Sequence, residues 1–469
     1  MGGTLETCEM SLIKSISGIR GTIGGDIGSA LTPVDIVKFT AAYAAQLKAK
    51  SPGQSSYKVV VGRDARISGA MVDNLVCATL MACGINVVNA GLASTPTTEM
   101  AVIFEKADGG IILTASHNPK QWNALKLLNS KGEFLSDAEG KALLSIAQDE
   151  SFDFVDVDSL GSMVHKDFTT AHIDAVVNHP LVDREAIRAA HFKVVLDPVN
   201  SVGGICMPLL FKALGVECIT INGNPDGNFA HNPEPLPANL SDLSQAVLRE
   251  KADLGVSVDP DVDRLAFICE DGKPFVEEYT LVAVADYILG VKPGPTVSNI
   301  SSSRALRDVT ESHGCSYSPS KVGEVNVTTM MQQVGAVIGG EGNGGVIVPS
   351  LHYGRDALIG AALFLSNLAN KKLSARALRS TYPDYYVSKN KIEMSDPARI
   401  EASLAKVEKA YEGEQVCKMD GLRIDFEAER KWLILRKSNT EPIIRIYSEA
   451  PSADAAEDLS RDVIKIINS

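Results

Sequence analysis

The sequence predicts an α/β protein made of repeated strand–helix units, followed by a smaller α+β domain. Three segments share one pattern, in which an amphipathic helix ends at a glycine and a strand follows: ACGINVV (82–88), ALGVECI (213–219) and SHGCSYS (312–318). Alternating strands and helices are typical of α/β layers with a largely parallel sheet. The residues from 373 onward differ, because their strand-like runs are bunched together between two helices. We therefore expect three related α/β units with mixed sheets and one C-terminal α+β domain.

The individual elements follow from local signals. YKVVVG (57–62) is a β-rich run and predicts a strand. A serine or threonine that precedes an apolar-periodic segment marks a helix start, and a proline or a glutamate just after it strengthens the signal. Helix starts are expected at Thr32-Pro33, at Ser68 and at the capping box formed by Ser136 and Glu139.

The length of 469 residues predicts two to four domains. Divisions are expected at the acidic, irregular stretch near 150–160, at the aspartate-rich loop near 255 and in the lysine-rich stretch 370–390. The predicted domains are therefore 1–155, 156–254, 255–372 and 373–469.

Composition restricts the class of protein. A net charge of −13 argues against a general nucleic-acid binder, although local arginines and lysines still permit a small anionic ligand. No apolar run reaches the roughly 18 residues that a membrane span needs, and the N-terminal residues do not resemble a secretory signal. Eight scattered cysteines without a CxxC pair suit reduced thiols better than disulfides or zinc. We expect a cytoplasmic protein that binds neither membrane nor nucleic acid.

The stretch ADLGVSVDPDVDRLAFICEDG (252–272) carries Asp259, Asp261 and Asp263 at alternate positions. Three carboxylates spaced in this way can converge on one hard cation such as Mg²⁺ or Ca²⁺. An EF-hand is disfavoured, because Arg264 stands where that loop needs glycine and the flanking runs resemble strands. A polar turn without a metal is the alternative, but a turn does not require three like charges.

The stretch VIGGEGNGGVIVPS (337–350) formally contains GxGxxG, the pattern of a dinucleotide-binding loop. That interpretation requires a helix directly after the glycines, whereas VIVPS is β-branched and ends in proline. The alternatives are a plain hairpin turn or a loop that presents Glu341 and Asn343 to hydroxyl or amino groups.

Three further segments bring arginines into loops. LRKSNTEPIIRIYSEA (435–450) places short hydrogen-bonding side chains between two arginines, whose guanidinium groups suit phosphate. Its candidate phosphate-binding residues are Arg436, Ser438, Asn439, Thr440 and Arg445. SISGIRGTIGG (15–25) surrounds Arg20 with glycines, and VGRDARISG (61–69) carries Arg63. Each segment alone is equally compatible with solvated polar loops.

The stretch IILTASHNPKQWNALKLL (111–128) places Ser116 and His117 just beyond an apolar run. Adjacent side chains normally point in different directions, so His117 is poorly placed as a base for Ser116. A GxSxG elbow and an HExxH motif are both absent from the sequence. A displayed serine, with Lys126 downstream and cation-binding and anion-binding loops elsewhere, suits phosphoryl transfer through a phosphorylated serine.

Taken together, the motifs resemble the α-D-phosphohexomutase superfamily of phosphoglucosamine, phosphomannose and phosphoglucose mutases. TASHNP is similar to its phosphoserine loop, DPDVDR to its metal loop, GEGNGG to its sugar loop and RKSNTEP to its phosphate-binding loop. SGIRG and GRDAR match further family positions, so the resemblance spans nearly the whole chain in the expected order. It implies four domains around a central cleft.

The resemblance also implies the roles of individual residues. Ser116 would carry the phosphoryl group, and one Mg²⁺ would lie between it and Asp259, Asp261 and Asp263. Lys126, with Arg20 and His117 nearby, would serve proton transfer. Substrate-binding positions would be Arg63, Arg264, Lys321, Glu341, Asn343, Arg436, Ser438, Asn439, Thr440 and Arg445. A sugar bisphosphate would be the intermediate and activator.

The details of two loops favour a particular substrate. Pro260 and Val262 replace glycines of the metal loop while its aspartates are kept. Asn343 stands where many phosphomannose and phosphoglucose mutases have serine, and GEGNGG together with KVGEVN (321–326) resembles archaeal-type glucosamine phosphate enzymes. We therefore expect a phosphoglucosamine mutase, monomeric or homodimeric. The alternatives are a phosphomannomutase/phosphoglucomutase and a non-catalytic sugar-phosphate binder.

Overall fold

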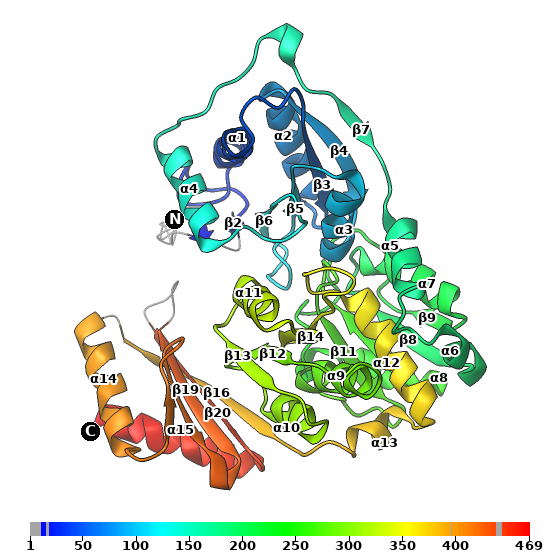
Figure 1. Ribbon diagram of the computed structural model, residues 1–469, viewed down its shortest axis with the longest axis vertical. Helices are drawn as coiled ribbons and strands as arrows, with labels where there is room; N and C mark the ends of the chain where they lie inside the picture. The colour runs from blue at the N-terminus through cyan, green and yellow to red at the C-terminus, as the bar shows by residue number, and fades with distance from the viewer. Residues whose placement is uncertain (1–10, 16–17, 395, 438–442) are drawn as a thin grey trace, which may run out of the picture.

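The computed structural model describes residues 11–15, 18–394, 396–437 and 443–469, which form four sheets with their covering helices (Figure 1). The first domain lies at the top of Figure 1, the second and third lie together below it, and the fourth lies to one side in orange and red. Three α/β units followed by an α+β domain are confirmed. No helix of the described residues is long and apolar enough to cross a membrane.

The first domain is a seven-stranded mixed sheet with helices on its faces. In sheet order its strands are β1 (Ile13–Ser15), β2 (Gly18–Thr22), β6 (Trp122–Leu128), β5 (Gly109–Leu113), β3 (Tyr57–Arg63), β4 (Ile85–Leu92) and β7 (Met163–His165). Its helices are α1 (Pro33–Lys50), α2 (Gly69–Ala82), α3 (Thr95–Glu105) and α4 (Asp137–Gln148).

The second and third domains each contain a four-stranded sheet. The second has β11 (Leu265–Cys269), β10 (Leu254–Val258), β8 (Lys193–Asp197) and β9 (Glu217–Thr220), with helices α5 (Thr169–Val177), α6 (Arg184–Ala190), α7 (Gly203–Leu214) and α8 (Ser241–Glu250). The third has β13 (Tyr317–Ser320), β12 (Thr296–Asn299), β14 (Ile338–Glu341) and β15 (Gly345–Ile347), with helices α9 (Glu278–Val291), α10 (Ala305–Ser312), α11 (Glu324–Val334), α12 (Ala357–Lys371) and α13 (Ala375–Arg379).

The fourth domain is an antiparallel sheet with two helices packed together against it. In sheet order its strands are β16 (Tyr386–Glu393), β20 (Ile443–Ala450), β19 (Lys431–Lys437), β18 (Leu422–Phe426) and β17 (Gln415–Cys417), and its helices are α14 (Pro397–Ala410) and α15 (Ala453–Asn468). Trp432 packs on Ile300 of the third domain, and its indole Nε1 donates to Glu449 at 2.7 Å. The same carboxylate oxygen accepts from the backbone N–H of Arg304 at 3.0 Å, which ties the fourth domain to the third.

The predicted internal repeat is present in the strand order. The strands run β4-β3-β5-β6, β9-β8-β10-β11 and β13-β12-β14-β15; the first three of each set are parallel and the last is antiparallel. Gly84, Gly215 and Gly314 follow equivalent helices with φ of 72°, 77° and 68°. These left-handed conformations are why glycine ends each helix. A hairpin closes each repeat and places loops 114–121, 259–264 and 342–344 at equivalent positions.

The start of α1 agrees with the predicted signal. Pro33 is in the first turn, and Thr32 and Asp35 form a capping box through each other's backbone N–H. Ser136 and Glu139 form the same device at α4. Ser68 precedes α2, but its side chain does not cap the helix and instead accepts from the Asn123 amide at 2.9 Å.

The division expected between residues 254 and 255 runs through a single sheet. Strand β10 begins at Leu254 and pairs with β8 on one side and with β11 on the other. The aspartate loop therefore closes the second sheet and does not open the third domain, because the antiparallel strand after it belongs to the same repeat.

A close contact in the first domain gives a stability prediction. A Cβ on Gly109 would lie 2.0 Å from the Tyr43 hydroxyl and 2.7 Å from the Leu128 carbonyl. A Cβ on Gly290, inside α9, would meet no atom closer than 3.9 Å. Gly109→Ala should destabilise the protein by about 1–3 kcal/mol through overpacking. Gly290→Ala should be neutral or stabilising by up to about 1 kcal/mol through helix propensity. Chemical denaturation of both variants measures this, and equal midpoints would contradict it.

Candidate active site

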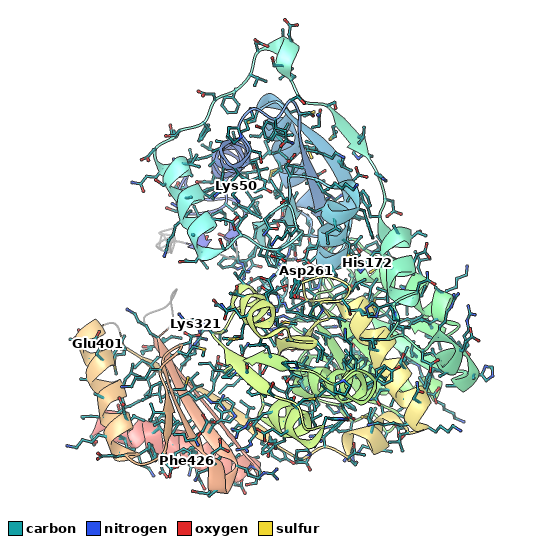
Figure 2. All side chains as sticks on the ribbon, viewed as in Figure 1. Lys50, His172, Asp261, Lys321, Glu401 and Phe426 are labelled. Atoms are coloured by element: carbon teal, nitrogen blue, oxygen red, sulfur yellow. The ribbon has the colours of Figure 1, made fainter. Side chains whose placement is uncertain are left out.

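The loops of the first and second domains meet through one hydrogen bond. Ser116 Oγ donates to Asp259 Oδ2 at 2.6 Å, and both side chains are buried. Ser116 has a φ of 49°, a left-handed conformation that is uncommon for a residue with a side chain. Asp261, two residues further along the same aspartate loop, lies where the first domain meets the two below it (Figure 2).

The serine loop is fixed by the buried guanidinium of Arg66. It donates to the carbonyl oxygens of Asn118 at 2.6 Å, Pro119 at 2.8 Å and Trp122 at 2.9 Å, and also to that of Ser116. Backbone carbonyls of an irregular loop have few other partners away from water, so the guanidinium supplies their hydrogen bonds and orders the loop.

Asp64 holds Arg66 in place and links it to the serine from the other side. Its Oδ2 accepts from Arg66 Nε at 3.1 Å and from the Thr114 hydroxyl at 2.6 Å. The Thr114 oxygen accepts from the backbone N–H of Ser116 at 2.9 Å. The left-handed backbone of Ser116 is thus fixed by a chain of hydrogen bonds that runs through Thr114 and Asp64 to Arg66.

Hydrogen bonds hold each of the three aspartates in place, Asp259 through both of its oxygens and the other two through Oδ2. Asp259 Oδ1 accepts from the backbone N–H groups of Asp263 (3.2 Å) and Arg264 (3.1 Å). Asp261 Oδ2 accepts from Lys126 Nζ at 2.7 Å and from a threonine hydroxyl at 2.6 Å. Asp263 Oδ2 accepts from a guanidinium at 2.6 Å.

The three aspartates together form a set of carboxylate oxygens that fits a divalent cation. Asp261 Oδ1 and Asp263 Oδ1 are buried and have no hydrogen-bond partner among the residues that the structure describes. One oxygen from each aspartate lies within 4.8 Å of one from each of the others. Unpaired buried carboxylate oxygens are costly, and Mg²⁺ prefers oxygen ligands of this kind.

The charges in this cluster are strongly coupled. Burial, together with Asp261 and Asp263, raises the pKa of Asp259 well above its ordinary value. Burial opposes ionisation of Asp261 too, but Lys126 outweighs it and lowers the pKa of that carboxyl. Three carboxylates so close together repel one another, and a cation among them would relieve that repulsion.

Two basic groups stand beside the serine. Burial alone would lower the pKa of Lys126, but Asp261 and Asp263 more than offset it, and the pKa is raised. Burial, with Arg264 and Arg20 nearby, lowers the pKa of His117 to about 2, so its imidazole is neutral at neutral pH.

The expectation that Ser116 and His117 point apart is wrong. His117 Nδ1 lies 3.3 Å from Ser116 Oγ. The left-handed backbone at Ser116 turns the chain sharply, so that two adjacent side chains face the same space. Arg20 lies close to the same loop and donates to Asn118 Oδ1 at 2.8 Å.

Glu341, at the end of β14, is held on both oxygens. Oε1 accepts from Asn299 Nδ2 at 2.7 Å and from the backbone N–H of Gly323 at 3.1 Å. Oε2 accepts from a guanidinium at 2.9 Å and lies 3.5 Å from Asn343 Nδ2. The loop after it leads into strand β15, so no helix is available to bind a dinucleotide pyrophosphate.

Sequence reasoning missed the residue that joins these loops. Arg355 supplies the guanidinium bound to both Asp263 and Glu341, and its Nε donates to Glu324 at 3.0 Å. It lies in HYGRD, which matches no motif that the sequence analysis identified. Its only signal was a charged residue just before the apolar helix α12.

The remaining expected residues are spread more widely. Arg264 is nearly buried and pairs with Glu234 at 3.0 Å, while Arg63 donates to the Asp64 carbonyl at 3.2 Å. Lys321 is exposed and precedes the third-domain helix α11. Arg63 and Lys321 make none of the aspartate or serine contacts described above, and Arg264 takes part in them only through its backbone N–H, which donates to Asp259.

The expected phosphate-binding residues lie on the fourth domain. Arg436 pairs with Asp420 at 2.8 Å and stands opposite Arg445 across β19 and β20. Ser438, Asn439 and Thr440 lie outside the described residues.

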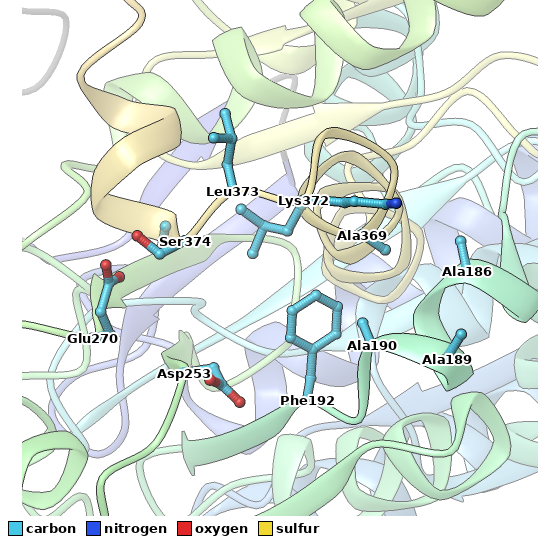
Figure 3. Close-up of a pocket in the computed structure, with 12 residues that line it drawn as sticks. Ala186, Ala189, Ala190, Phe192, Asp253, Glu270, Ala369, Lys372, Leu373 and Ser374 are labelled. Atoms are coloured by element: carbon cyan, nitrogen blue, oxygen red, sulfur yellow. The ribbon is translucent and has the colours of Figure 1, made fainter.

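A cavity of about 530 Å³ lies elsewhere, between α6 and the segment from the end of α12 to α13 (Figure 3). Its lining is mostly apolar and includes Phe192 and Leu373. Its two carboxylates are already engaged by backbone N–H groups, Asp253 by that of Lys193 at 2.8 Å and Glu270 by that of Arg376 at 3.0 Å. It shares no residue with the serine–aspartate site.

Comparisons with known proteins agree with this architecture. Four phosphoglucomutase/phosphomannomutase domains match in order: α/β/α domain I over residues 12–154, domain II over 170–272, domain III over 277–385 and the C-terminal domain over 390–466. Domain II includes β10, β11 and the aspartate loop, in agreement with the sheet.

Individual relatives match along almost the whole chain. A phosphoglucomutase/phosphomannomutase of Thermococcus kodakarensis is 34% identical over 454 residues, covering 96% of this chain and 97% of its own. A phosphoglucosamine/phosphogalactosamine mutase of Sulfurisphaera tokodaii is 32% identical over 470 residues, covering 98% and 99%. A solved phosphoglucomutase/phosphomannomutase family protein of Burkholderia thailandensis superposes with a TM-score of 0.83 at 25% identity, covering 98% and 97%.

These matches, on a fold that brings a serine against three aspartates, define the class of protein as a phosphohexomutase, an intramolecular phosphotransferase. The chain belongs to the phosphoglucomutase/phosphomannomutase family.

The unpaired aspartate oxygens generate a prediction for metal binding. Mg²⁺ at about 100 times its Kd should stabilise the wild-type protein by roughly 2.7 kcal/mol, because it binds only the folded state. Asp261→Asn keeps the side-chain shape but removes a charge, so this stabilisation should be largely lost. Asp197→Asn is the matched control, since Asp197 is equally buried but pairs with His231 at 3.0 Å. Thermal unfolding with and without Mg²⁺ measures the effect, and an undiminished shift in Asp261→Asn would contradict it.

Proposed function

We propose that the protein interconverts glucosamine 6-phosphate and glucosamine 1-phosphate through a phosphorylated Ser116 and a sugar bisphosphate. The observation that carries this proposal is the hydrogen bond from Ser116 Oγ to Asp259, beside two carboxylate oxygens that lack a partner among the described residues. A serine in that position can carry a phosphoryl group whose charge a cation held by the three aspartates would balance.

The reaction needs two phosphoryl transfers in opposite directions. In the first, the bond between phosphorus and Ser116 Oγ breaks, a bond to a sugar hydroxyl oxygen forms, and the hydroxyl gives up its proton. The bisphosphate then presents its other phosphate, which returns to Ser116 Oγ, while the sugar oxygen that leaves regains a proton. Positioning and electrostatic stabilisation supply most of the catalysis in such transfers.

Proton transfer and cation binding are assigned to different residues of the site. Two side chains are placed to take part in proton transfer: His117, whose Nδ1 lies 3.3 Å from Ser116 Oγ, and Lys126, whose Nζ lies 2.7 Å from Asp261 Oδ2. Asp259, Asp261 and Asp263, with the serine phosphoryl group, would hold Mg²⁺. When bound, Mg²⁺ supplies a cation that offsets the charge on the transferred group.

Binding of the sugar falls to two other loops. Glu341 and Asn343 would contact sugar hydroxyl or amino groups, and Arg436 and Arg445 of the fourth domain would hold the phosphate that is not reacting. Arg63, Arg264 and Lys321 are further candidates, as are Ser438, Asn439 and Thr440, whereas Arg20 would assist proton transfer beside Lys126. Both ends of the bisphosphate must use the same binding sites. The bisphosphate therefore has to reverse its orientation in the site between the two transfers.

The choice of glucosamine phosphate rests on the sugar loop and on the relatives. Asn343 offers an amide where a serine is common in mannose and glucose enzymes. A 32% identical relative from Sulfurisphaera tokodaii is named a phosphoglucosamine/phosphogalactosamine mutase, and a 31% identical relative from Methanopyrus kandleri is named a probable phosphoglucosamine mutase. The second candidate is a phosphomannomutase/phosphoglucomutase, which the 34% identical Thermococcus kodakarensis relative favours.

A substrate comparison tests the assignment. We expect the highest kcat/KM with glucosamine phosphate when it is measured beside the mannose and glucose pairs, with the matching sugar bisphosphate supplied as activator. A clear preference for mannose phosphate would transfer the assignment to the second candidate.

The phosphoserine has a separate test by intact mass. A fraction of the purified protein should carry about 80 Da of phosphate, the mass of one phosphoryl group on serine. Ser116→Ala should remove both the added mass and the turnover. Ser68→Ala is the control, because Ser68 bonds the neighbouring Asn123 but stands outside the serine–aspartate contacts. Turnover that survives Ser116→Ala would exclude this mechanism, and binding without turnover in the wild type would favour a sugar-phosphate binder.

A further inference from the structure

One buried guanidinium joins the metal loop to the sugar loop. Each nitrogen of Arg355 donates to a different carboxylate: Nη2 to Asp263 Oδ2 at 2.6 Å, Nη1 to Glu341 Oε2 at 2.9 Å and Nε to Glu324 Oε2 at 3.0 Å. All four side chains are at least nine-tenths buried. Asp263 follows β10 of the second domain, whereas Glu341 ends β14 of the third.

The geometry of these bonds fixes which atoms face the site. At Asp263 the bond engages Oδ2 and leaves Oδ1 without a partner among the described residues. At Glu341 the same guanidinium holds Oε2, while Asn299 and Gly323 hold Oε1. The planar group therefore sets the rotation of both carboxylates at once, which a point charge cannot do.

Glu324 fixes the arginine itself. Its Oε1 accepts from the backbone N–H of Arg355 at 2.9 Å, and its Oε2 accepts from the Nε of the same residue. Main chain and side chain of Arg355 are thus both anchored to the first residue of α11. Among the described residues no hydrogen bond joins Glu324 to Asp263 or to Glu341, so its influence on their orientation passes through the arginine.

We infer that Arg355, anchored by Glu324, is a positioning residue: its single guanidinium group orients both the cation ligand Asp263 and the sugar-binding Glu341. The inference rests on the proposed function, because it takes Asp263 as a Mg²⁺ ligand and Glu341 as a sugar contact. A consequence is that one substitution, at a residue that is neither a proposed cation ligand nor a proposed sugar contact, weakens metal binding and sugar binding together.

Arg355→Lys is the decisive variant because it separates geometry from charge. Removing the positive charge would by itself attract Mg²⁺, which would mask the loss of alignment. Lysine keeps the charge, but its ammonium cannot reproduce the three-way planar contact. Arg379→Lys is the matched control: Arg379 is equally buried, pairs with Asp384 at 2.8 Å and stacks on Tyr279, away from both loops.

Two binding measurements on the full-length protein give the test. We expect Arg355→Lys to weaken Mg²⁺ binding, measured calorimetrically without sugar, by about 10-fold or more, as loss of a partner behind a metal ligand does. Its KM for the sugar phosphate at saturating Mg²⁺ should rise as well. Arg379→Lys should change neither quantity. Glu324→Asp keeps the charge but shortens the side chain that anchors Arg355, so it should shift both quantities in the same direction by a smaller factor; it is the test variant if Arg355→Lys does not fold.

The outcomes separate this inference from the proposed function. Unchanged Mg²⁺ affinity in a folded Arg355→Lys, with normal mutase activity in the wild type, would overturn the inference alone. A lower unfolding temperature with unchanged Mg²⁺ affinity would likewise overturn it, because that is the signature of a purely structural arginine. A wild type that converts no hexose or hexosamine phosphate would overturn the proposed function, while the effect of Arg355→Lys on Mg²⁺ affinity would still be measurable.

Discussion

Three carboxylates are buried within a few ångströms of one another where two sheets end, and their mutual repulsion governs the structure around them. Asp259 is held by two backbone N–H groups, Asp261 by Lys126 and Asp263 by Arg355. These contacts come from three different domains. A negative cluster of this kind cannot be assembled by one unit of the fold alone, because too few cations and N–H donors lie within its own loop. The domains are therefore held together at the point where the chemistry is proposed to occur.

The repeat explains how loops so far apart in sequence carry related tasks. In each of the first three domains a hairpin follows the third strand of the repeat, and these hairpins carry Ser116, the three aspartates and Asn343. In the proposed mechanism, the same position in the three repeats therefore has three different roles: an acceptor for a phosphoryl group, a set of oxygen ligands and a polar contact for a sugar. The first two meet directly through Ser116 and Asp259, and the third is joined to them by Arg355.

Much of the fold was predictable because its signals are local. The capping residues Thr32 and Ser136 and the helix-ending glycines fix backbone conformation within a few residues, so the sequence alone located those elements. The division expected near residue 254 assigns β11 to the third domain, whereas β11 belongs to the second sheet. Nothing in the local sequence of β11 shows that this strand pairs with β10.

The site was predicted unevenly for the same reason. Ser116, the aspartates and Lys126 stand in recognisable motifs, and the structure brings them together. The approach of His117 to Ser116 depends on a left-handed backbone, which residue order does not reveal. Arg355 was missed because its importance lies in contacts with residues 14, 31 and 92 positions away.

The distribution of apolar contacts among the domains has a consequence for how the protein unfolds. The second and third domains share one continuous hydrophobic cluster, whereas the first and the fourth are built mainly on clusters of their own, with small apolar contacts at Ala65 and at Trp432. Units that share a core unfold cooperatively, and units joined mainly by polar contacts do so separately. Heating should therefore produce more than one calorimetric transition, with the central pair of domains acting as a single block. The serine and its aspartates lie on opposite sides of a boundary between such blocks, so the catalytic arrangement can be lost while every core remains intact.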